Sequence, residues 1–314
     1  MPPRQPGPTV CTIFEGHYHF GGAALVNSLL AHGYTGKVWI GTRGALPPWV
    51  GSLQESGPNR YVVAGVELCF VQLDVQRTMS AEKPRLMLQI LRELEPESNG
   101  VVYFDADIVL NVPWTIISDW VGRGVALCED NCFGYMAGNH LLRAQWTDFA
   151  NSTFPANPVR RELNRSYNAG FVGVARQHAS FLDTWHEATS RLPVPDAGVS
   201  LKMGTRWSGF SSMEQDTLNV TAMVSAEPLV TLGPEGMGFA PGLNAMLHAV
   251  DTPKPWRKWY VWHLLYKGVG VGPADRAYWE HASGPLATWP TALAWLHRLD
   301  MFCAIALSRF YHSA

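Results

Sequence analysis

Val101-Val102-Tyr103-Phe104-Asp105-Ala106-Asp107 is the most informative segment of this chain. Four strand-forming residues end there at two carboxylates separated by one alanine. Because residues two apart on an extended chain point to the same side, Asp105 and Asp107 are expected to face the same way. Two carboxylates this close raise each other's pKa unless a cation lies between them, and a hard divalent cation also binds a diphosphate. The segment predicts a buried strand that ends at a metal site, with an ordinary surface turn as the alternative.

Strand-like and helix-like segments alternate on the amino-terminal side of this segment. Apolar and β-branched runs predict strands at 10–14, at 37–41 and within 61–73, and helical spacing predicts helices at 21–32 and 84–94. This alternation is typical of an α/β fold, with a mainly parallel sheet flanked by helices. In such sheets ligands bind beyond the carboxyl ends of the strands, which is where the two aspartates are expected.

The carboxyl-terminal half is less regular. The segment 129–167 is polar, aromatic and interrupted by Pro155 and Pro158, so it is predicted to be a binding loop or lid. We find no repeat or linker that divides the chain. The sequence therefore predicts one domain over 1–286, followed by a C-terminal helix over 287–314.

Composition excludes few classes of protein. The chain has 314 residues, of which 47% are hydrophobic and 16% charged, as in a globular protein. The formal net charge of −2 gives no basic footprint, so nucleic acid is not an expected partner. Five cysteines without a paired Cys-x-x-Cys spacing predict reduced, packed thiols. Without an apolar leader or a run of about 18 apolar residues, we expect a cytoplasmic protein with no spanning helix.

Four separated segments carry motifs in a fixed order. They are the strand end at 103–107, Tyr-Asn-Ala-Gly-Phe at 167–171, Glu-Gln-Asp-Thr-Leu-Asn at 214–219 and His-Ala-Val-Asp-Thr-Pro-Lys-Pro-Trp at 248–256. Together they resemble the retaining glycosyltransferases of family GT8, which include the glycogenins and bacterial lipooligosaccharide galactosyltransferases. The resemblance spans about residues 10–257. It implies a GT-A (Rossmann-like) domain over 1–286 that moves a hexosyl group from a UDP-sugar to a hydroxyl acceptor.

The resemblance implies a metal site. Its ligands would be Asp105, Asp107 and His248, and an imidazole mixed with carboxylates suits Mn²⁺, with Mg²⁺ as the alternative. Lys254 would reach a phosphate as a point charge. Metal and lysine together would neutralise the departing nucleoside diphosphate, where the largest charge of the reaction develops.

The resemblance also implies a set of donor-binding residues. Its members are Thr12, Glu15, Tyr18, Arg85, Asp105, Ala106, Asn168, Ala169, Gly170 and Lys254. Tyr18 would stack on the uracil, with Phe20 as the alternative. Arg85 would touch the donor sugar and diphosphate, with Lys83 as the alternative. An acidic residue from Glu129-Asp130 is expected to bind sugar hydroxyls.

Gln215 and Glu214 are the catalytic residues that the resemblance implies, with Gln215 beneath the anomeric carbon. Retention of configuration requires either a side-chain nucleophile or front-face attack within an ion pair. Because an amide is a poor nucleophile, we favour front-face attack, with Gln215 stabilising positive charge on the sugar. Two residues depart from the family pattern. Glu214 replaces an aspartate, and Asp251 replaces a glycine whose missing Cβ lets the backbone approach the diphosphate.

Two other functions remain open. A nucleotidyltransferase also holds a metal with paired acids, but it usually has a Gly-rich phosphate loop near the first strand, for which Gly21-Gly22 is too short. The other alternative is a sugar-nucleotide-binding protein that has lost turnover. The main reason for it is Asp251, which replaces the glycine of the family pattern. The acceptor is open among a glycan, a lipid-linked saccharide, a natural product and a protein hydroxyl.

The tail 289–311 combines many Trp, Leu and Phe residues with His297, Arg298 and Arg309. One interpretation is a C-terminal helix packed on the protein's own core. The other is an amphipathic helix at a membrane interface, with aromatic and basic anchors. The second interpretation makes the protein peripheral to a membrane and favours a lipid-linked acceptor.

Overall fold

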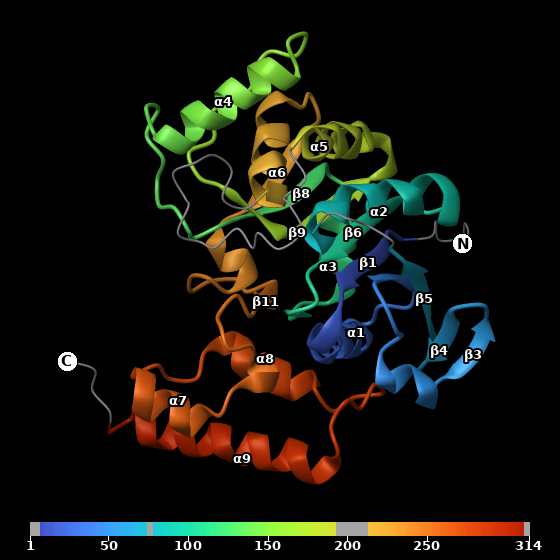
Figure 1. The fold of residues 1–314 in the computed structure, drawn as a ribbon, viewed down its shortest axis with the longest axis vertical. Helices are drawn as coiled ribbons and strands as arrows, with labels where there is room; N and C mark the ends of the chain where they lie inside the picture. Colours follow the sequence, from blue (N-terminus) through green and yellow to red (C-terminus); the bar gives the residue numbers. More distant parts are fainter. Residues whose placement is uncertain (1–6, 74–77, 193–212, 311–314) are drawn as a thin grey trace.

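The computed structural model describes residues 7–73, 78–192 and 213–310. Its centre is a nine-stranded sheet in the order β10-β8-β9-β6-β1-β2-β5-β4-β3 (Figure 1). The strands are β1 (Thr9–Phe14), β2 (Lys37–Thr42), β3 (Gln54–Gly57), β4 (Arg60–Val63), β5 (Val66–Gln72), β6 (Gly100–Phe104), β8 (Val125–Glu129), β9 (Tyr167–Ala175) and β10 (Leu229–Leu232). A second sheet pairs β7 (Ile108–Leu110) with β11 (Met246–His248).

Most strands of the large sheet point the same way. β1 is parallel to β2 and β6, β2 is parallel to β5, and β10 is parallel to β8. Only β9 and β4 run against the others, because β9 is antiparallel to β6 and β8, and β4 is antiparallel to β5 and β3. The predicted α/β fold with a mainly parallel sheet is confirmed. The edge strand β3 escaped prediction because Gln54-Glu55-Ser56-Gly57 has no apolar alternation.

Both faces of the sheet are covered by helices, as the period of two along β1 shows. Val10 and Phe14 lie in one core with α1 (His19–Ala31) and α3 (Trp114–Val121). Cys11 and Ile13 lie in the opposite core. The helices of that second core are α2 (Lys83–Gln89), α4 (Leu141–Thr153), α5 (Ser180–Arg191) and α6 (Met213–Val224). The predicted helix 84–94 is α2 continued by a π-helix over Ile90–Leu94.

The segment 129–167 is more regular than predicted, because it contains α4. This helix buries only Arg143, Trp146 and Ala150, so its apolar periodicity is weak. The His140 side chain caps the helix by accepting a hydrogen bond from the Leu142 N–H at 3.3 Å. The prediction of an uninterrupted loop is therefore wrong for the residues of α4.

A separate helical layer packs below α1 (Figure 1). It consists of α7 (Tyr260–Lys267), α8 (Pro273–His281) and α9 (Thr291–Ser308). α8 contacts α1, β7 and β11, and α9 packs on α7. Trp279 is buried at its centre and stacks on His297 with 4.9 Å between ring centroids. No helix in the described ranges is both long and apolar enough to cross a membrane.

None of the five cysteines, all of which lie in the described ranges, is in a disulfide, and they fall into two groups. Cys11, Cys69 and Cys128 are buried, as packed thiols should be. Cys132 and Cys303 are exposed, so the prediction of packing is wrong for these two.

Candidate active site

The three predicted metal ligands meet at the carboxyl edge of the sheet. Asp105 directly follows β6, and the ladder of β7 with β11 places His248 opposite Ile108, the residue after Asp107. His248 Nε2 lies 3.1 Å from Asp107 Oδ1 and 3.8 Å from Asp105 Oδ2. One ligand atom from each residue lies within 4.8 Å of the others. The strand end and a residue more than 140 positions later thus form one cluster.

This cluster fits a divalent cation. Two carboxylates and one imidazole are ligands that Mn²⁺ and Mg²⁺ accept. His248 is buried, and its Nε2 is the ring nitrogen that faces both carboxylates. Its Nδ1 is also buried and has no hydrogen-bond partner among the described residues. Nε2 is therefore the atom that His248 offers to a metal.

Lys254 lies on the other side of Asp107. Its Nζ is 2.7 Å from Asp107 Oδ2 and donates to the Ala249 carbonyl at 2.6 Å. Burial alone would raise the pKa of Asp107, but His248 and Lys254 together hold this pKa well below its usual range. Asp107 is therefore a carboxylate, with the cationic side chain of Lys254 beside it.

Lys83, and not Arg85, contacts the cluster. Its Nζ lies 2.9 Å from Asp105 Oδ1 and 3.9 Å from Glu214 Oε1, and it donates to the Ala169 carbonyl at 3.0 Å. Lys83 is 3% exposed. Burial works against its charge, but Asp105 and Glu214 outweigh burial and raise the pKa of Lys83 above 10.5. Arg85 instead pairs with Glu82.

Tyr103 is a member of the site that the motifs did not identify. Its hydroxyl donates to Asp105 Oδ1 at 2.7 Å, and burial followed by the charge of Asp105 raises the pKa of Tyr103 well above 10. Tyr103 precedes Asp105 by two residues, so the alternation along a strand puts both side chains on one side. That alternation was visible in the sequence.

A second polar cluster surrounds Asp130, which directly follows β8 and is 2% exposed. Asp130 Oδ2 accepts hydrogen bonds from Gln215 Nε2 at 2.7 Å and from Asn168 Nδ2 at 3.1 Å. Gln215 Oε1 accepts from the Ala169 N–H at 3.3 Å. Because β9 runs against β6 and β8, its first residues lie at the same edge as Asp105 and Asp130. The motifs 167–171 and 214–219 thus meet at Asp130.

Asn219 explains how α6 brings Gln215 to this edge. Its side chain pairs with the backbone of Tyr167, accepting from the N–H at 2.7 Å and donating to the carbonyl at 3.0 Å. The same amide donates to the Gln215 carbonyl at 2.8 Å. Asp216 accepts from the buried Trp146 indole at 3.0 Å, which joins α6 to α4. Most of the motif 214–219 therefore positions α6.

Two glycines allow the close approaches on which the cluster depends. A Cβ at Gly170 would lie 2.6 Å from His248 Cε1 and 2.7 Å from Asn168 Oδ1. A Cβ at Gly21 would lie 2.3 Å from the Ala106 carbonyl oxygen and 2.7 Å from the Trp256 ring. α1 therefore packs directly on the Asp-x-Asp segment, and β9 packs directly on the histidine.

The substitution Gly170→Ala is expected to displace the His248 ring. We expect a loss of about 1–3 kcal/mol in the free energy of unfolding, as for other overpacked sites, and weaker Mn²⁺ binding. Urea unfolding and calorimetric titration with Mn²⁺ would measure both. Gly134→Ala is the matched control, because a Cβ at Gly134 has no neighbour within 4 Å. Equal effects of the two substitutions would contradict the role given to Gly170.

The residues expected to bind a nucleobase lie around the end of β1. Thr12 is fully buried, and its hydroxyl has no partner among the described residues. Glu15 faces Arg43, with 3.7 Å between Oε2 and Nη1, and both line a cavity of about 400 Å³ at the ends of β1 and β2. The ring of Tyr18 lies 5.5 Å from that of Trp256 and 5.9 Å from Lys254 Nζ.

Phe20, the alternative to Tyr18, packs elsewhere. Its ring stacks on His19 and lies 4.8 Å from Trp289 at the edge of the helical layer. Of the two aromatic residues, Tyr18 is therefore the one beside Lys254. Asp251 is exposed and lines a hollow of about 210 Å³ next to His248.

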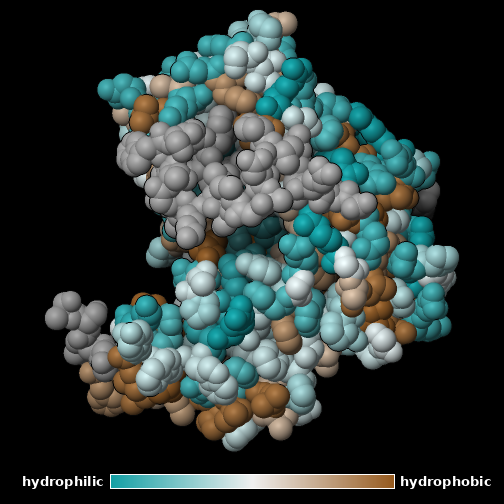
Figure 2. All heavy atoms as spheres, viewed as in Figure 1, coloured by the Kyte–Doolittle hydropathy of each residue, from teal (hydrophilic) through white to brown (hydrophobic). Residues whose placement is uncertain are grey.

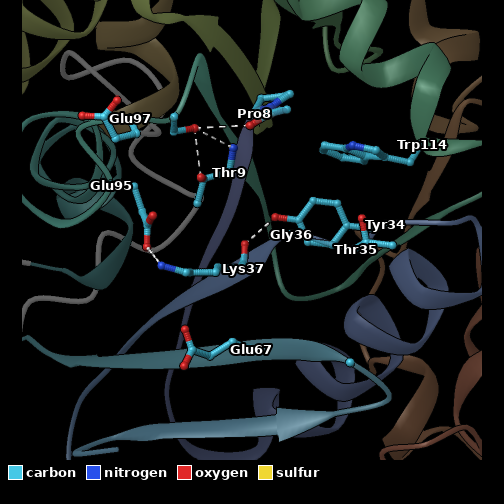
Figure 3. Close-up of a pocket in the computed structure, with 13 residues that line it drawn as sticks. Pro8, Thr9, Tyr34, Thr35, Gly36, Lys37, Glu67, Glu95, Glu97 and Trp114 are labelled. Carbon is cyan, nitrogen blue, oxygen red and sulfur yellow. Dashed lines mark hydrogen bonds and ion pairs between the residues drawn. The ribbon is translucent and has the colours of Figure 1, made fainter. Parts of the chain in front are cut away.

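The pocket in Figure 3 lies at the opposite, amino-terminal edge of the sheet. It measures about 520 Å³ and is lined by the first residues of β1 and β2 together with Tyr34, Trp114 and Glu97. Lys37 pairs with Glu95 at 2.7 Å across it. None of the predicted site residues lines this pocket. The polar groups of this pocket bind one another and link the ends of the strands. We therefore do not propose it as the active site.

Comparisons with known proteins establish the fold. No protein-family model matches the sequence, and no curated protein matches it either. Solved structures of similar fold include the apo form of the bifunctional glycosyltransferase WbbM (TM-score 0.52, 13% identity), which the chain matches over 96% of its own length and 53% of that chain. The apo form of the glycosyltransferase GlyE of Streptococcus pneumoniae TIGR4 is similar too (TM-score 0.50, 16% identity, 94% and 64% covered).

An active-site mutant of LgtC is the third similar structure, with a TM-score of 0.51 and 13% identity. The chain matches it over 92% of its own length and 99% of that chain, whereas it spans about half of WbbM and under two thirds of GlyE. At these identities the likeness shows a shared architecture. The predicted GT-A fold is confirmed in this sense.

Proposed function

We propose that this chain is a metal-dependent, retaining glycosyltransferase that moves a hexosyl group from a UDP-sugar to a hydroxyl acceptor. The observation that carries the proposal is the meeting of two clusters at one sheet edge. The Asp105, Asp107 and His248 cluster suits a metal–diphosphate, and Asp130 fixes the amides of Gln215 and Asn168 at the same edge. Lys83 joins them, because its ammonium contacts both Asp105 and the Ala169 carbonyl. The glycosyltransferase fold supports this assignment.

The charges of the site suit the departure of a nucleoside diphosphate. A bound Mn²⁺ or Mg²⁺ would supply Lewis-acid stabilisation of the diphosphate. Lys254 lies beside Asp107 and adds a positive charge at the same place, which lowers the energy of the transition state where negative charge develops. Tyr18, next to Lys254, would stack on the base, and polar contacts with the base would lie in the cavity beside Glu15.

Gln215 has a defined orientation that suits front-face attack. Its Nε2 donates to Asp130, which fixes the amide, and its Oε1 accepts one hydrogen bond from the Ala169 N–H. A carbonyl oxygen has two lone pairs, so Oε1 keeps one for the positive charge that develops at the anomeric carbon. Because an amide is a poor nucleophile, this arrangement favours stabilisation of the sugar cation over a covalent intermediate.

The test is a titration of the purified protein with UDP-glucose, UDP-galactose and UDP-N-acetylglucosamine, with and without Mn²⁺. We expect one of them to bind only with the metal and to release UDP slowly, and His248→Ala to abolish both effects. His263→Ala, which changes a half-buried histidine of α7, is the matched control and should behave as wild type. Calorimetry and UDP release are the measurements.

The remaining outcomes separate the alternatives. Binding without turnover, including after addition of glycan and lipid-linked acceptors, would indicate a sugar-nucleotide-binding protein. Pyrophosphate release from a nucleoside triphosphate and a sugar phosphate would indicate a nucleotidyltransferase. If no nucleotide sugar binds in the presence of Mn²⁺, the proposal is wrong.

A further inference from the structure

The outermost helix, α9, shows its large apolar side chains to solvent. Its buried residues are Ala294, His297, Met301 and Ala304, most of them small or polar. Its exposed residues include Trp295 at 63% and Phe302 at 62%, with Leu293, Leu296, Leu299 and Leu307 between 40% and 43%. A helix of a soluble protein normally turns its large apolar residues towards the core. α9 has the reverse arrangement.

The neighbouring helix α7 continues this apolar surface. Trp262 and Tyr266 are 69% and 71% exposed and stack in parallel, with 6.0 Å between ring centroids. Leu265 and Val269 are each 49% exposed. Because α7 packs on α9, these residues and those of α9 belong to one helical layer. Figure 2 shows hydrophobic surface gathered along the lower edge of the molecule, over this layer. Leaving so many large side chains in water is costly, since burial of each contributes about 1.5–3 kcal/mol.

The same part of the chain is basic. Residues 257–310 contain six Lys and Arg residues but only three Asp and Glu residues, although the whole chain has a net charge of −2. Asp275 pairs with Lys258 at 2.8 Å, which leaves five cations against Asp300 and Glu280, and Asp300 accepts hydrogen bonds from the first N–H groups of α7. Arg257, Lys267, Arg276 and Arg309 are exposed. Positive charge beside aromatic and aliphatic side chains complements an anionic lipid surface.

A groove beside α9 combines both kinds of group. It measures about 590 Å³ and lies between α8 and α9. Met301, Phe302 and Ile305 form its apolar wall, and two cations, Arg276 and Arg298, line it together with one carboxylate, Glu280. The guanidinium of Arg298 is held by the Trp279 carbonyl, to which its Nε donates at 3.0 Å. Such a groove suits a lipid whose headgroup carries negative charge and whose chains are apolar.

We propose that α7 and α9 form a peripheral binding surface for bilayers that contain anionic phospholipid, with the groove between α8 and α9 holding a lipid headgroup. The aromatic residues enter the interface, and the basic residues select the charge of the surface. The proposal goes beyond the transferase assignment and does not depend on it, because lipid binding needs no nucleotide sugar.

Flotation with vesicles tests the proposal. The full chain is mixed with vesicles of phosphatidylcholine alone or of equal parts phosphatidylcholine and phosphatidylglycerol. We expect partition into the anionic vesicles to be at least about tenfold stronger, because each basic residue near such a surface contributes about 1 kcal/mol. High salt should reduce this difference, since it screens the exposed charges.

Matched triple variants locate the surface. Trp262→Ser with Trp295→Ser and Phe302→Ser is expected to abolish flotation. Ile116→Ser with Tyr135→Ser and Leu141→Ser changes three exposed apolar residues elsewhere and should float as wild type. Circular dichroism and urea unfolding establish that both variants fold. Arg276→Gln with Arg298→Gln should lower only the preference for anionic vesicles.

Three results would overturn the proposal. The first is absence of flotation with either kind of vesicle. The second is equal flotation of wild type and the folded patch variant. The third is a concentration-dependent dimer, seen by analytical ultracentrifugation without vesicles, that the patch variant abolishes, because a second copy of the chain would then cover this surface.

Discussion

The substitution Asp107→Asn is expected to reduce Mn²⁺-dependent release of UDP from the donor sugar by more than the about 10- to 100-fold typical of residues that only support a metal ligand. The change keeps the size of the side chain but removes the negative charge. Asp107 contacts both His248 at 3.1 Å and Lys254 at 2.7 Å, so its charge also orients the two other groups expected to hold the metal–diphosphate. Calorimetric titration with Mn²⁺ in the presence of UDP measures the loss of metal affinity, and UDP release measures the loss of turnover.

Asp119→Asn is the matched control, because Asp119 is an exposed aspartate on α3. It should leave both quantities unchanged. If Asp107→Asn keeps metal affinity and UDP release within about threefold of wild type, a difference of under 1 kcal/mol, the acidic cluster is only an ion-pair network. The metal-binding role of the strand end would then be wrong.

The substitution Lys83→Met is expected to destabilise the fold by about 3 kcal/mol. Removal of one member of a buried ion pair usually costs about 3–5 kcal/mol, and the partial exposure of Asp105 places the effect at the lower end. The variant leaves the carboxylates of Asp105 and Glu214 near each other without the ammonium between them. Urea unfolding at neutral pH measures the loss, and UDP-sugar binding is expected to weaken with it.

The pH dependence gives Lys83 a second test. Its pKa in the folded state is raised above the ordinary value of 10.5, so the stabilisation is fully present below that pH and is lost as the pH rises through the folded value. The difference in stability between wild type and Lys83→Met should therefore shrink above about pH 10.5. Arg92→Met, which breaks a surface pair with Asp183 in which the side chains are 55% and 46% exposed, should cost less than about 1 kcal/mol. Equal losses for the two variants would contradict the assignment of Lys83.

The sequence predicted the parts of the site that depend on local pattern. A buried strand ending in two acids predicted β6 and its carboxylates, and the order of four motifs predicted that His248, Asn168 and Gln215 would lie near them. Alternation along the strand also places Tyr103 and Asp105 on the same side, so their contact could have been predicted, but the motifs give Tyr103 no role. These features depend on residues close in sequence or on a fold recognised as a whole.

The rest depends on three-dimensional packing. Lys83 and Arg85 both lie at the start of α2, and only the packing of that helix against β6 and β9 decides which of them faces Asp105. The helix α4 escaped prediction because a single buried stripe of three residues is too narrow a pattern. In α9 the apolar residues occur around most of the helix, so composition could not tell which side faces the protein.

Trp256 connects the candidate active site to the helical layer. Trp256 follows Lys254 by two residues, and its indole donates to His17 at 2.9 Å. Its ring lies 5.4 Å from that of Tyr278 of α8, in the buried cluster of the helical layer. If that layer shifts at a bilayer, Trp256 would carry the shift towards Lys254, the lysine that we propose to bind phosphate. Thermodynamic reciprocity then fixes the size of the effect in both directions. By whatever factor a bilayer changes the affinity for the donor, the donor changes the affinity for the bilayer by the same factor.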